Sequence, residues 1–176
     1  YIVTTYIPGV PWSALQPRLE SEQQESAREQ IAAALASLHD ITFPTFGDLP
    51  PGDTPTPYLD ALLARANARI KGTANARLFA DVLSERRELF ASVTQPCLCH
   101  DDLHHHNILF RPEGTVWRLA GILDFDSAWA GHHESDLARL DLWRGMTSPR
   151  FRRIYRAAHA VDLGYEERRP VHQLLW

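Results

Sequence analysis

The sequence predicts an α+β fold that is mainly helical, in which short β-hairpins carry polar loops. Three observations support this prediction. Residues 21–39 place apolar side chains at helical spacing, and residues 58–71 and 74–92 also have helix-like patterns. Residues 108–110 and 116–122 are short apolar runs separated by turn residues, as in a hairpin. With 176 residues, the chain is long enough to bury a core of its own.

The amino-terminal run has the composition of a strand. Residues 2–5 are rich in β-branched side chains, which favour a buried strand, and Pro8-Gly9 then breaks it. An ordinary edge strand is the alternative. The chain starts at Tyr1, without Met and inside this apolar run, so we expect the parent protein to begin earlier.

Residues 21–39 form the clearest predicted helix. Ser21 and Gln24 have the spacing of a capping box, and Glu22 and Glu25 suit the first turn. The apolar stripe consists of Ala27, Ile31, Ala34, Leu35 and Leu38. The helix ends at a Leu-His pair in which we expect His39 to be structural.

The following segments alternate between loops and helices. Residues 42–57 contain five prolines and predict an irregular connector. Helices are expected to start near Ser135, Pro149 and Pro170. The last of them reaches Trp176 without a stop signal, which predicts that the parent protein continues beyond this chain.

Composition limits the partners. The net charge is −4, and no run of about 18 apolar residues exists, so neither a nucleic-acid partner nor a membrane is expected. The arginines of residues 144–156 are expected to form a solvated helix face. Cys97 and Cys99 are predicted to point to opposite faces of a strand and to remain free thiols, which favours the cytoplasm. The sequence does not determine the oligomeric state.

Two polar blocks carry the chemistry. Asp102 is followed after four residues by Asn107, and seventeen residues later comes Asp124-Phe125-Asp126. Each block follows a short apolar run. This is the set that phosphoryl transfer from a nucleotide needs: one carboxylate faces the attacking hydroxyl, while a carboxamide and a second carboxylate hold magnesium on the phosphates.

The individual roles follow from this chemistry. Asp102 is the predicted catalytic residue, and Asn107 and Asp124 are the predicted magnesium ligands. We expect His100 to brace the loop and not to act as a base. For Asp126, contact with a second metal and capping of a turn remain equal alternatives.

The blocks resemble the aminoglycoside phosphotransferase and choline-kinase-like superfamily of small-molecule kinases. The signature H-G-D-L-H-x-x-N, I-D-[FW]-[DE], D-L-A is matched by His100, Asp102, Leu103, His104, Asn107, then residues 123–126, then Asp136, Leu137 and Ala138. Asp101 replaces the usual Gly. If that position has a positive φ, Asp is among the better-tolerated substitutes.

The resemblance implies a protein-kinase-like large lobe at residues 13–176. Residues 1–12 would be the last small-lobe strand and the hinge, with most of the small lobe absent from the chain. ATP, with GTP possible, would meet Thr5 and Ile7 at its adenine edge and Thr4 at the back of the pocket. Asp136 would brace the catalytic loop, with an N-cap as the alternative.

The resemblance also frames the substrate. Only eleven residues separate Asp124 from Asp136, and no A-P-E motif occurs, so a small hydroxylated acceptor is expected in place of a peptide. An aminoglycoside-type antibiotic is the leading acceptor, which would make the protein a resistance enzyme. The acidic wall for such a polycation would consist of Glu134, Asp141, Glu166 and Glu167. Ketosamine, choline, homoserine and sugar alcohols are alternatives. The loop 42–57 would either border this site or serve as a plain connector.

Two rival hypotheses belong to other classes. A zinc site could draw on the histidines and cysteines, although H-E-x-x-H and C-x-x-C are both absent. The candidate ligands are His100, His104, His105, His106, His132, His133, Cys97 and Cys99. A non-catalytic, kinase-like binding domain is the second rival, and the intact Asp102, Asn107 and Asp124 argue against it.

Overall fold

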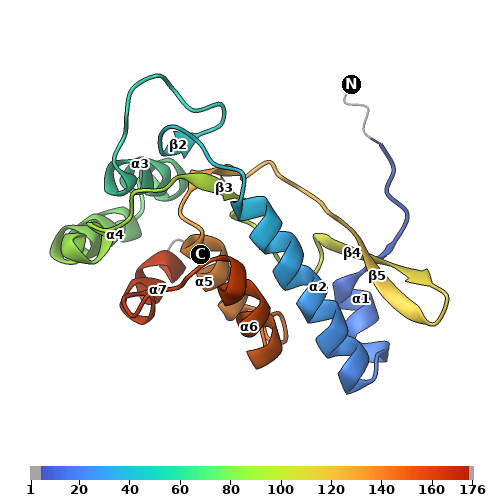
Figure 1. Cartoon of the computed structure of the whole chain (residues 1–176). Helices are drawn as coiled ribbons and strands as arrows, with labels where there is room; N and C mark the ends of the chain where they lie inside the picture. Colours follow the sequence, from blue (N-terminus) through green and yellow to red (C-terminus); the bar gives the residue numbers. More distant parts are fainter. Residues whose placement is uncertain (1–4, 175–176) are drawn as a thin grey trace.

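The computed structural model describes residues 5–174, so Thr4 and most of the predicted strand at residues 2–5 lie outside the described residues. Residues 5–9 are irregular, and the first strand is β1 (Val10–Pro11). The long helix α2 (Ser21–His39) runs through the middle of the molecule, with a hairpin at one end and two helices, α3 and α4, at the other (Figure 1).

Two small antiparallel sheets organise the chain. In the first, β1 and β5 (Val116–Ile122) flank β4 (Ile108–Glu113). In the second, β2 (Gly47–Asp48) and β3 (Cys97–Cys99) flank β6 (Trp129–Gly131). The loop from β3 to β4 and the loop from β5 to β6 therefore both run from one sheet to the other. Because β3 pairs with β6 and β4 pairs with β5, both ends of both loops are held together.

The hairpin and most helices lie where the sequence predicts them. The strands of the hairpin extend further into the turn than expected, to Glu113, and Gly114 supplies the positive φ of +61° that the turn requires. The other helical elements are α1 (Trp12–Leu15), the 3₁₀ helix Gln16–Arg18, α3 (Tyr58–Ile70), α4 (Ala74–Glu85), the 3₁₀ helix Arg87–Phe90, α5 (Glu134–Leu142), α6 (Pro149–Ala158) and α7 (Tyr165–Gln173).

The helix α2 has the predicted bounds, but its capping box and the start of the last helix differ from the prediction. The capping box of α2 lies one residue earlier than expected: the Glu20 side chain accepts from the N3 amide, and Gln23 accepts from the Glu20 amide. The last helix starts five residues before Pro170, at Tyr165. Proline is common at a first helical position, which is why the sequence suggested a start there. In the structure Gly164 precedes the helix, and Glu166 and Glu167 occupy its first turn.

Two hydrophobic clusters fill the interior. The larger joins α2, β4, α5 and α6, and Trp12 packs on Phe110 with ring centroids 5.3 Å apart. The second joins α3, α4, β3 and β6 around Tyr58 and Trp129. Fully burying a large apolar side chain stabilises the fold by about 1.5–3 kcal/mol. The two clusters therefore hold the two sheets, and with them the connecting loops, in place.

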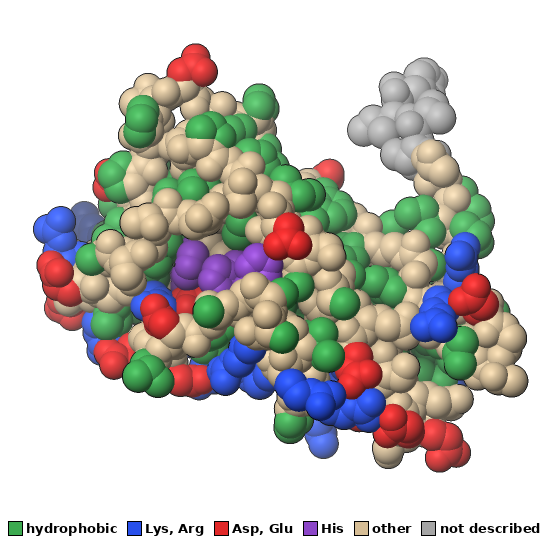
Figure 2. Space-filling view, viewed as in Figure 1, with side chains coloured by type: hydrophobic (Ala, Val, Ile, Leu, Met, Phe, Trp, Pro, Cys, Tyr) green, Lys and Arg blue, Asp and Glu red, His purple; other side chains and the backbone are tan. Residues whose placement is uncertain are grey.

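Three arginines of residues 144–156 form ion pairs with neighbouring helices: Arg150, Arg152 and Arg153. Arg150 donates to Glu22 and Glu29 of α2, and Arg152 donates to Asp141 of α5. Positive and negative side chains accordingly alternate along the lower edge of the molecule in Figure 2. Within residues 5–174, no helix combines the length and the apolar character that crossing a membrane requires.

The two cysteines correct one prediction. Cys97 and Cys99 are buried free thiols, as expected. Their sulfur atoms, however, lie only 3.8 Å apart. The prediction of opposite faces was wrong because successive residues of a strand alternate, so residues two apart share a face.

His172 of α7 is an uncharged histidine inside the second cluster. It is 1% exposed, and its ring packs edge-on against Phe90 at 5.6 Å between centroids. Burial lowers the pKa of His172 to about 3, with Arg168 and His133 acting in the same direction. In the unfolded chain this imidazole titrates near its usual pKa of about 6.5.

We predict that this difference destabilises the protein at low pH. Between about pH 6.5 and 3 the unfolded chain binds a proton that the folded chain excludes, so the free energy of unfolding falls as the pH falls. The contribution of His172 is up to about 1.4 kcal/mol per pH unit. Urea unfolding of the His172→Gln variant should show a shallower pH dependence than wild type. An unchanged slope would contradict the buried, neutral state of His172.

Candidate active site

The two polar loops lie side by side between the sheets. The amide of Leu123 donates to the carbonyl of Asn107 at 2.8 Å, which extends the β4–β5 pairing toward the loops. His100 Nε2 lies 2.8 Å from the carbonyl of Leu123. The loop that contains Asp102 and the loop that contains Asp124 are therefore joined directly by hydrogen bonds.

His100 occupies the junction in one tautomer. Its Nδ1 accepts from the amide of Asp102 at 3.3 Å, which assigns the ring proton to Nε2 and makes Nε2 the donor to the Leu123 carbonyl. The ring also packs against Phe125 with 4.6 Å between centroids. Both nitrogens hold backbone in place, which is the geometry expected of a residue that braces the loop.

Asp136 anchors the catalytic-type loop from the helix α5. Its carboxylate is completely buried and accepts from the amides of His100 at 2.8 Å and Asp101 at 2.7 Å, and from His39 Nε2 at 3.0 Å. Burial alone would raise the pKa of Asp136, but the hydrogen bonds from His39 and the two amides hold it below its usual value. The helix begins after His133 without a side-chain cap, so Asp136 is inside the helix and is not its N-cap.

The anchor continues into a chain of polar groups behind the loop. His39 Nδ1 lies 2.6 Å from the Tyr155 hydroxyl, and His133 Nδ1 lies 3.0 Å from the same hydroxyl. A consistent assignment has His133 donating to Tyr155, Tyr155 donating to His39, and His39 donating to Asp136. Burial lowers the pKa of His133 to about 3, which keeps that imidazole neutral in this chain of hydrogen bonds.

Asp101 takes the position where the resembling family has glycine, and its φ is +60°. Its buried carboxylate pairs with Arg65 Nε at 2.5 Å and with Arg69 at 2.8 Å, both from α3. Burial raises the pKa of Asp101 to about 6, while the two arginines act in the opposite direction. An Asp here therefore tolerates the unusual backbone and also ties the loop to α3.

Arg65 connects the loop 42–57 to the same place. Besides Asp101 it binds Asp48 of β2 at 3.0 Å and the carbonyl of Ser127, and its guanidinium lies 4.8 Å from the Trp129 ring centroid. The proline-rich loop is therefore linked to the polar loops by Arg65 of α3, and also by the pairing of β2 with β6.

Asp102 is partly open to solvent. Its Oδ1 accepts from Arg139 of α5 at 2.9 Å, and its Oδ2 lies 3.9 Å from His104 Nε2. Sequence reasoning missed Arg139, although a signal was present. Arg139 follows Asp136 by three residues, and this spacing places both on one helical face, toward the loop.

Asn107 and Asp124 flank the open end of the β4–β5 hairpin. The side-chain amide of Asn107 donates to the carbonyl of Asp102 at 3.1 Å, which leaves its oxygen Oδ1 available. Asp124 has a φ of +66° and is exposed, and within residues 5–174 no hydrogen bond or ion pair engages its carboxylate. The backbone of Asn107 bonds to Leu123, the residue before Asp124, and two hard oxygen donors from such adjoining positions suit magnesium, which prefers few protein ligands and retains waters.

The remaining predicted residues are not brought together. Thr4 lies outside the described residues, Thr5 is exposed, and Ile7 lies over Gly121 of β5. Asp126 is exposed near Asp124, and neither of its two possible roles is favoured.

The four residues of the predicted acidic wall have different surroundings. Glu134 is 1% exposed, and both of its oxygens accept from Arg168 at 2.7 Å. Asp141 accepts from Arg152, Thr147 and Tyr165. Only Glu166 and Glu167 are exposed, at the start of α7. The carboxylates of Glu134 and Asp141 are therefore engaged in ion pairs within the protein.

This fold and these loops define the class of protein. A mainly helical α+β lobe, with an Asp-x₄-Asn loop and an Asp-Phe-Asp loop clamped between two small sheets, is the large lobe of a protein-kinase-like fold. The chain belongs to the phosphotransferase enzyme family (APH), whose sequence profile matches residues 1–171.

Solved structures agree with this assignment. A candidate fructosamine-3-kinase from Thermobifida fusca YX-ER1 is 28% identical, with a TM-score of 0.57 over 85% of this chain and 56% of that protein. A type VIII aminoglycoside-3′-phosphotransferase is 22% identical, with a TM-score of 0.64 over 97% of this chain and 67% of that protein. The streptomycin–ATP complex of APH(2″)-IIa is 21% identical, with a TM-score of 0.57 over 97% of this chain and 63% of that protein.

These comparisons confirm the predicted fold class. The chain spans 56% of the length of the Thermobifida fusca protein. A search of curated protein sequences gave no match.

We predict that Asp136→Asn loosens the catalytic-type loop. Asn offers one acceptor oxygen in place of two, so one of the amides of His100 and Asp101 loses its partner while buried. The free energy of unfolding should fall by about 1–3 kcal/mol, measured by urea denaturation. Hydrogen exchange at these two amides should accelerate beyond what the global loss explains.

The matched control is Asp81→Asn, the same chemical change at an exposed position of α4. It should leave stability and both amides unchanged. Unaltered protection of His100 and Asp101 in the Asp136 variant would contradict the anchoring role.

Proposed function

We propose that the protein transfers the γ-phosphate of ATP to a hydroxyl of a small molecule. The observation that supports the proposal is that hydrogen bonds join the β3–β4 loop to the β5–β6 loop. Asp102 and Asn107 stand on one, Asp124 stands on the other, and direct hydrogen bonds hold the loops together. Phosphoryl transfer depends mainly on positioning and electrostatics, and loops fixed at both ends supply the first of these.

In the proposed mechanism each residue has one task. Asp102 accepts a hydrogen bond from the acceptor hydroxyl and aligns it for in-line attack. Arg139 fixes Oδ1 of this carboxylate, so Oδ2 is the oxygen left for the hydroxyl. The transition state is loose, so Asp102 takes the proton late.

Asn107 and Asp124 complete the site on the nucleotide side. They would hold magnesium through Asn107 Oδ1 and the Asp124 carboxylate, and the bound ion supplies charge neutralisation to the nucleotide phosphates. The hydrogen bond from the Asn107 side chain to the Asp102 carbonyl fixes the proposed magnesium ligand relative to the proposed catalytic residue. ATP use is supported by the ATP complex of the similar APH(2″)-IIa structure, and GTP remains to be compared with it. The buried free thiols suit a cytoplasmic enzyme.

Two classes of acceptor are proposed. An aminoglycoside-type antibiotic is supported by the likeness to two aminoglycoside phosphotransferase structures. A ketosamine-type metabolite alcohol is the second candidate, and two observations favour it. The candidate fructosamine-3-kinase has the higher identity of the three comparisons. In addition, Glu134 and Asp141 are engaged internally and do not form an acidic wall for a polycation.

The test is ADP release by the full-length protein with Mg-ATP or Mg-GTP. The acceptor panel should contain aminoglycosides, other antibiotics, ketosamines, choline, sugars and amino-alcohols. Release stimulated by one class would identify both reaction and acceptor. Nucleotide that binds without any stimulated release across the panel would count against phosphoryl transfer and for a binding role.

The proposed role of Asp102 is tested by Asp102→Asn in the full-length protein. Asn keeps the size of the side chain but cannot take the proton, so acceptor-stimulated turnover should fall by about 10²–10⁴-fold. Nucleotide affinity and the melting temperature should remain close to wild type. Asp81→Asn on α4 is the matched control and should keep full turnover. Turnover at the wild-type level in the Asp102 variant would refute its assignment as the catalytic residue.

The proposed role of Asp124 as a magnesium ligand is tested by Asp124→Asn. Removing the charge of this carboxylate should weaken nucleotide binding in the presence of magnesium while leaving magnesium-free binding little changed. Calorimetric titration with the nucleotide, with and without magnesium, measures this difference. A variant whose binding responds to magnesium as wild type does would exclude Asp124 as a ligand.

A further inference from the structure

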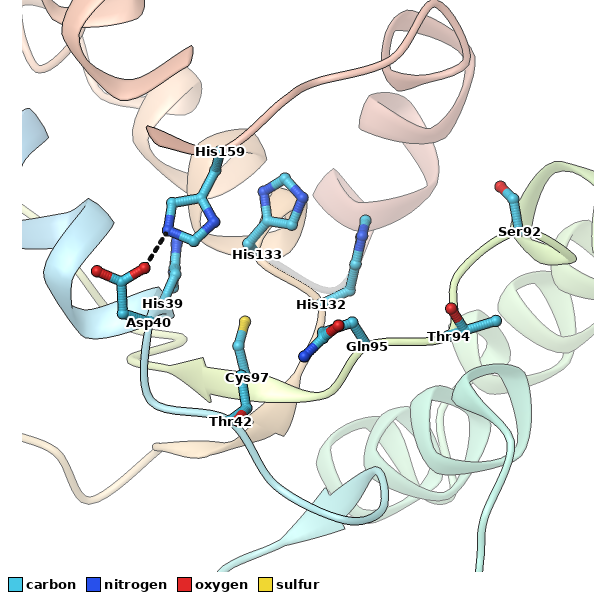
Figure 3. Close-up of a pocket in the computed structure, with 10 residues that line it drawn as sticks. All are labelled: His39, Asp40, Thr42, Ser92, Thr94, Gln95, Cys97, His132, His133 and His159. Carbon is cyan, nitrogen blue, oxygen red and sulfur yellow. Dashed lines mark ion pairs between the residues drawn. The ribbon is translucent and has the colours of Figure 1, made fainter. Parts of the chain in front are cut away.

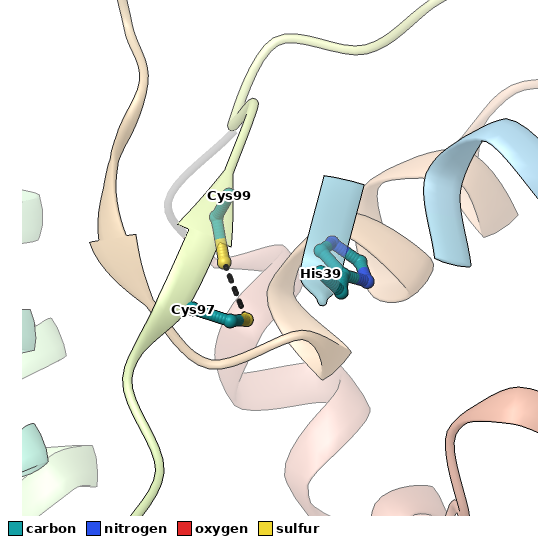
Figure 4. Close-up of side chains that lie close together, drawn as sticks. All are labelled: His39, Cys97 and Cys99. Carbon is teal, nitrogen blue, oxygen red and sulfur yellow. Dashed lines mark hydrogen bonds between the residues drawn. The ribbon is translucent and has the colours of Figure 1, made fainter. Parts of the chain in front are cut away.

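A second cluster of metal-binding side chains lies behind the catalytic-type loop. It consists of Cys97 and Cys99 of β3 and His39 at the end of α2, and one ligand atom from each lies within 4.8 Å of the others. All three residues are buried. Figure 4 shows the two thiols turned toward each other with the His39 ring beside them. None of the three is a proposed magnesium ligand or catalytic residue, although His39 supports the loop through Asp136.

The spacing of the sulfur atoms fits a single tetrahedral ion. Two thiolates bound to one zinc ion at about 2.3 Å lie about 3.8 Å apart. The sulfur atoms of Cys97 and Cys99 are 3.8 Å apart in the structure. The two donors therefore already have the separation that such an ion requires.

The backbone holds this separation in place. Cys97 pairs with Gly131 and Cys99 pairs with Trp129 across the β3–β6 ladder. On the other side of β3, Thr42 forms an isolated antiparallel bridge with Cys97. A side chain at Gly131 would collide with the Trp129 ring, so the partner strand is closely packed here. Both thiols are consequently presented on one face without rearrangement.

His39 has the support that metal-binding histidines usually have. Its Nε2 donates to the buried carboxylate of Asp136, and a histidine that binds a metal commonly donates its other ring nitrogen to a carboxylate. His39 Nδ1 shares the Tyr155 hydroxyl with His133. Binding therefore requires His39 to exchange that hydroxyl for the ion while it keeps Asp136.

An entry path leads to the cluster. A cavity of about 390 Å³ is lined by His39, Cys97, His132, His133 and His159, among other residues (Figure 3). The histidine side chains show at the surface as a strip in a hollow of the face in Figure 2. The cavity gives an ion access to Cys97 and His39, and a water in the cavity can complete a fourth position.

The neighbouring cluster of His132, Glu134 and His172 fits an ion less well. Its ligand atoms also lie within 4.8 Å of one another. Both oxygens of Glu134 are, however, taken by the buried guanidinium of Arg168 at 2.7 Å. A cation at this point would be repelled by Arg168 and would compete with it for the carboxylate.

We propose that Cys97, Cys99 and His39 bind a thiophilic divalent cation of the zinc class. Each thiol gives up its proton to solvent when the ion binds. This site is separate from the magnesium ligands Asn107 and Asp124, and the proposal stands independently of the phosphoryl transfer. Through His39 and Asp136, occupancy of the site would reach the amides that hold the catalytic-type loop.

The experiment titrates metal-free, tag-free protein with Cd²⁺ in the presence of a phosphine reductant. A thiolate–cadmium charge-transfer band in the ultraviolet should rise to saturation at one ion per chain, and Zn²⁺ should abolish it by displacing Cd²⁺. The band requires thiolate and therefore does not report the exposed histidines, and the serine variants assign it to Cys97 and Cys99. Circular dichroism of each metal-free protein checks its fold.

The variants separate the ligands. Cys97→Ser and Cys99→Ser should each reduce the saturated band to about half or less, because each removes one thiolate. His39→Gln should keep the band at saturation but require more Cd²⁺ to reach it. His159→Gln is the matched control, since His159 lines the same cavity but bonds to the Ala36 carbonyl and should titrate as wild type.

Three outcomes of the cadmium titration would overturn the proposal. One is the absence of a band in the wild-type protein. Another is a full band in either serine variant, which would exclude binding by both thiolates. The third is a stoichiometry of one ion per two chains, which would place the thiolates between molecules. If a serine variant fails to fold, wild-type protein alone decides, because Zn²⁺ should slow the reaction of both thiols with a thiol reagent at least tenfold and an unchanged rate would refute the site.

Discussion

The buried carboxylate of Asp136 is the interaction on which the rest of the site depends. It accepts hydrogen bonds from two successive amides of the catalytic-type loop and from the imidazole of His39. These bonds join α5, the loop and the end of α2 at one point. A carboxylate in an apolar interior is costly unless its oxygens are satisfied, and here three donors satisfy it. The same requirement that keeps Asp136 ionised also fixes the backbone that presents Asp102.

Arginines pair with the other two carboxylates of the loop, those of Asp101 and Asp102. Arg65 and Arg69 hold Asp101 toward α3, and Arg139 holds Asp102 toward α5. The loop is therefore bound by α3 on one side and α5 on the other, and each of its ends continues into a sheet. Asp124, by contrast, has an exposed carboxylate that no described residue engages, as suits a ligand that must take up an ion and release it. The rigid and the available parts of the site are built from different residues.

Much of the fold and the order of the polar residues could be predicted from the sequence. The helix α2, the β4–β5 hairpin and the two polar loops each have a local cause in periodicity, turn residues or apolar flanks. The conformation of Asp101 followed from an expected glycine position, and its positive φ is confirmed. Local patterns sufficed because these elements are short-range structures.

What could not be predicted depends on contacts distant in the sequence. Arg65 and Asp101 are 36 residues apart, so no local pattern connects them, and Arg139, 37 residues from Asp102, was indicated only indirectly by its spacing from Asp136. The ion pairs of Glu134 with Arg168 and of Asp141 with Arg152 also join different helices, so the sequence did not indicate that these two carboxylates are engaged internally. The start of α7 was misplaced because Pro170 favours a first turn yet is also tolerated inside this helix. The cysteines were misjudged by a plain error about the period of a strand.

Transfer of labelled γ-phosphate from Mg-ATP to a small molecule by the full-length protein tests the central claim most directly. We expect label to appear covalently on the acceptor, and only when acceptor and protein are both present. Label that appears solely as inorganic phosphate, or remains on a nucleotide that the protein nevertheless binds, across ketosamines, aminoglycosides and the other alcohols, would contradict it.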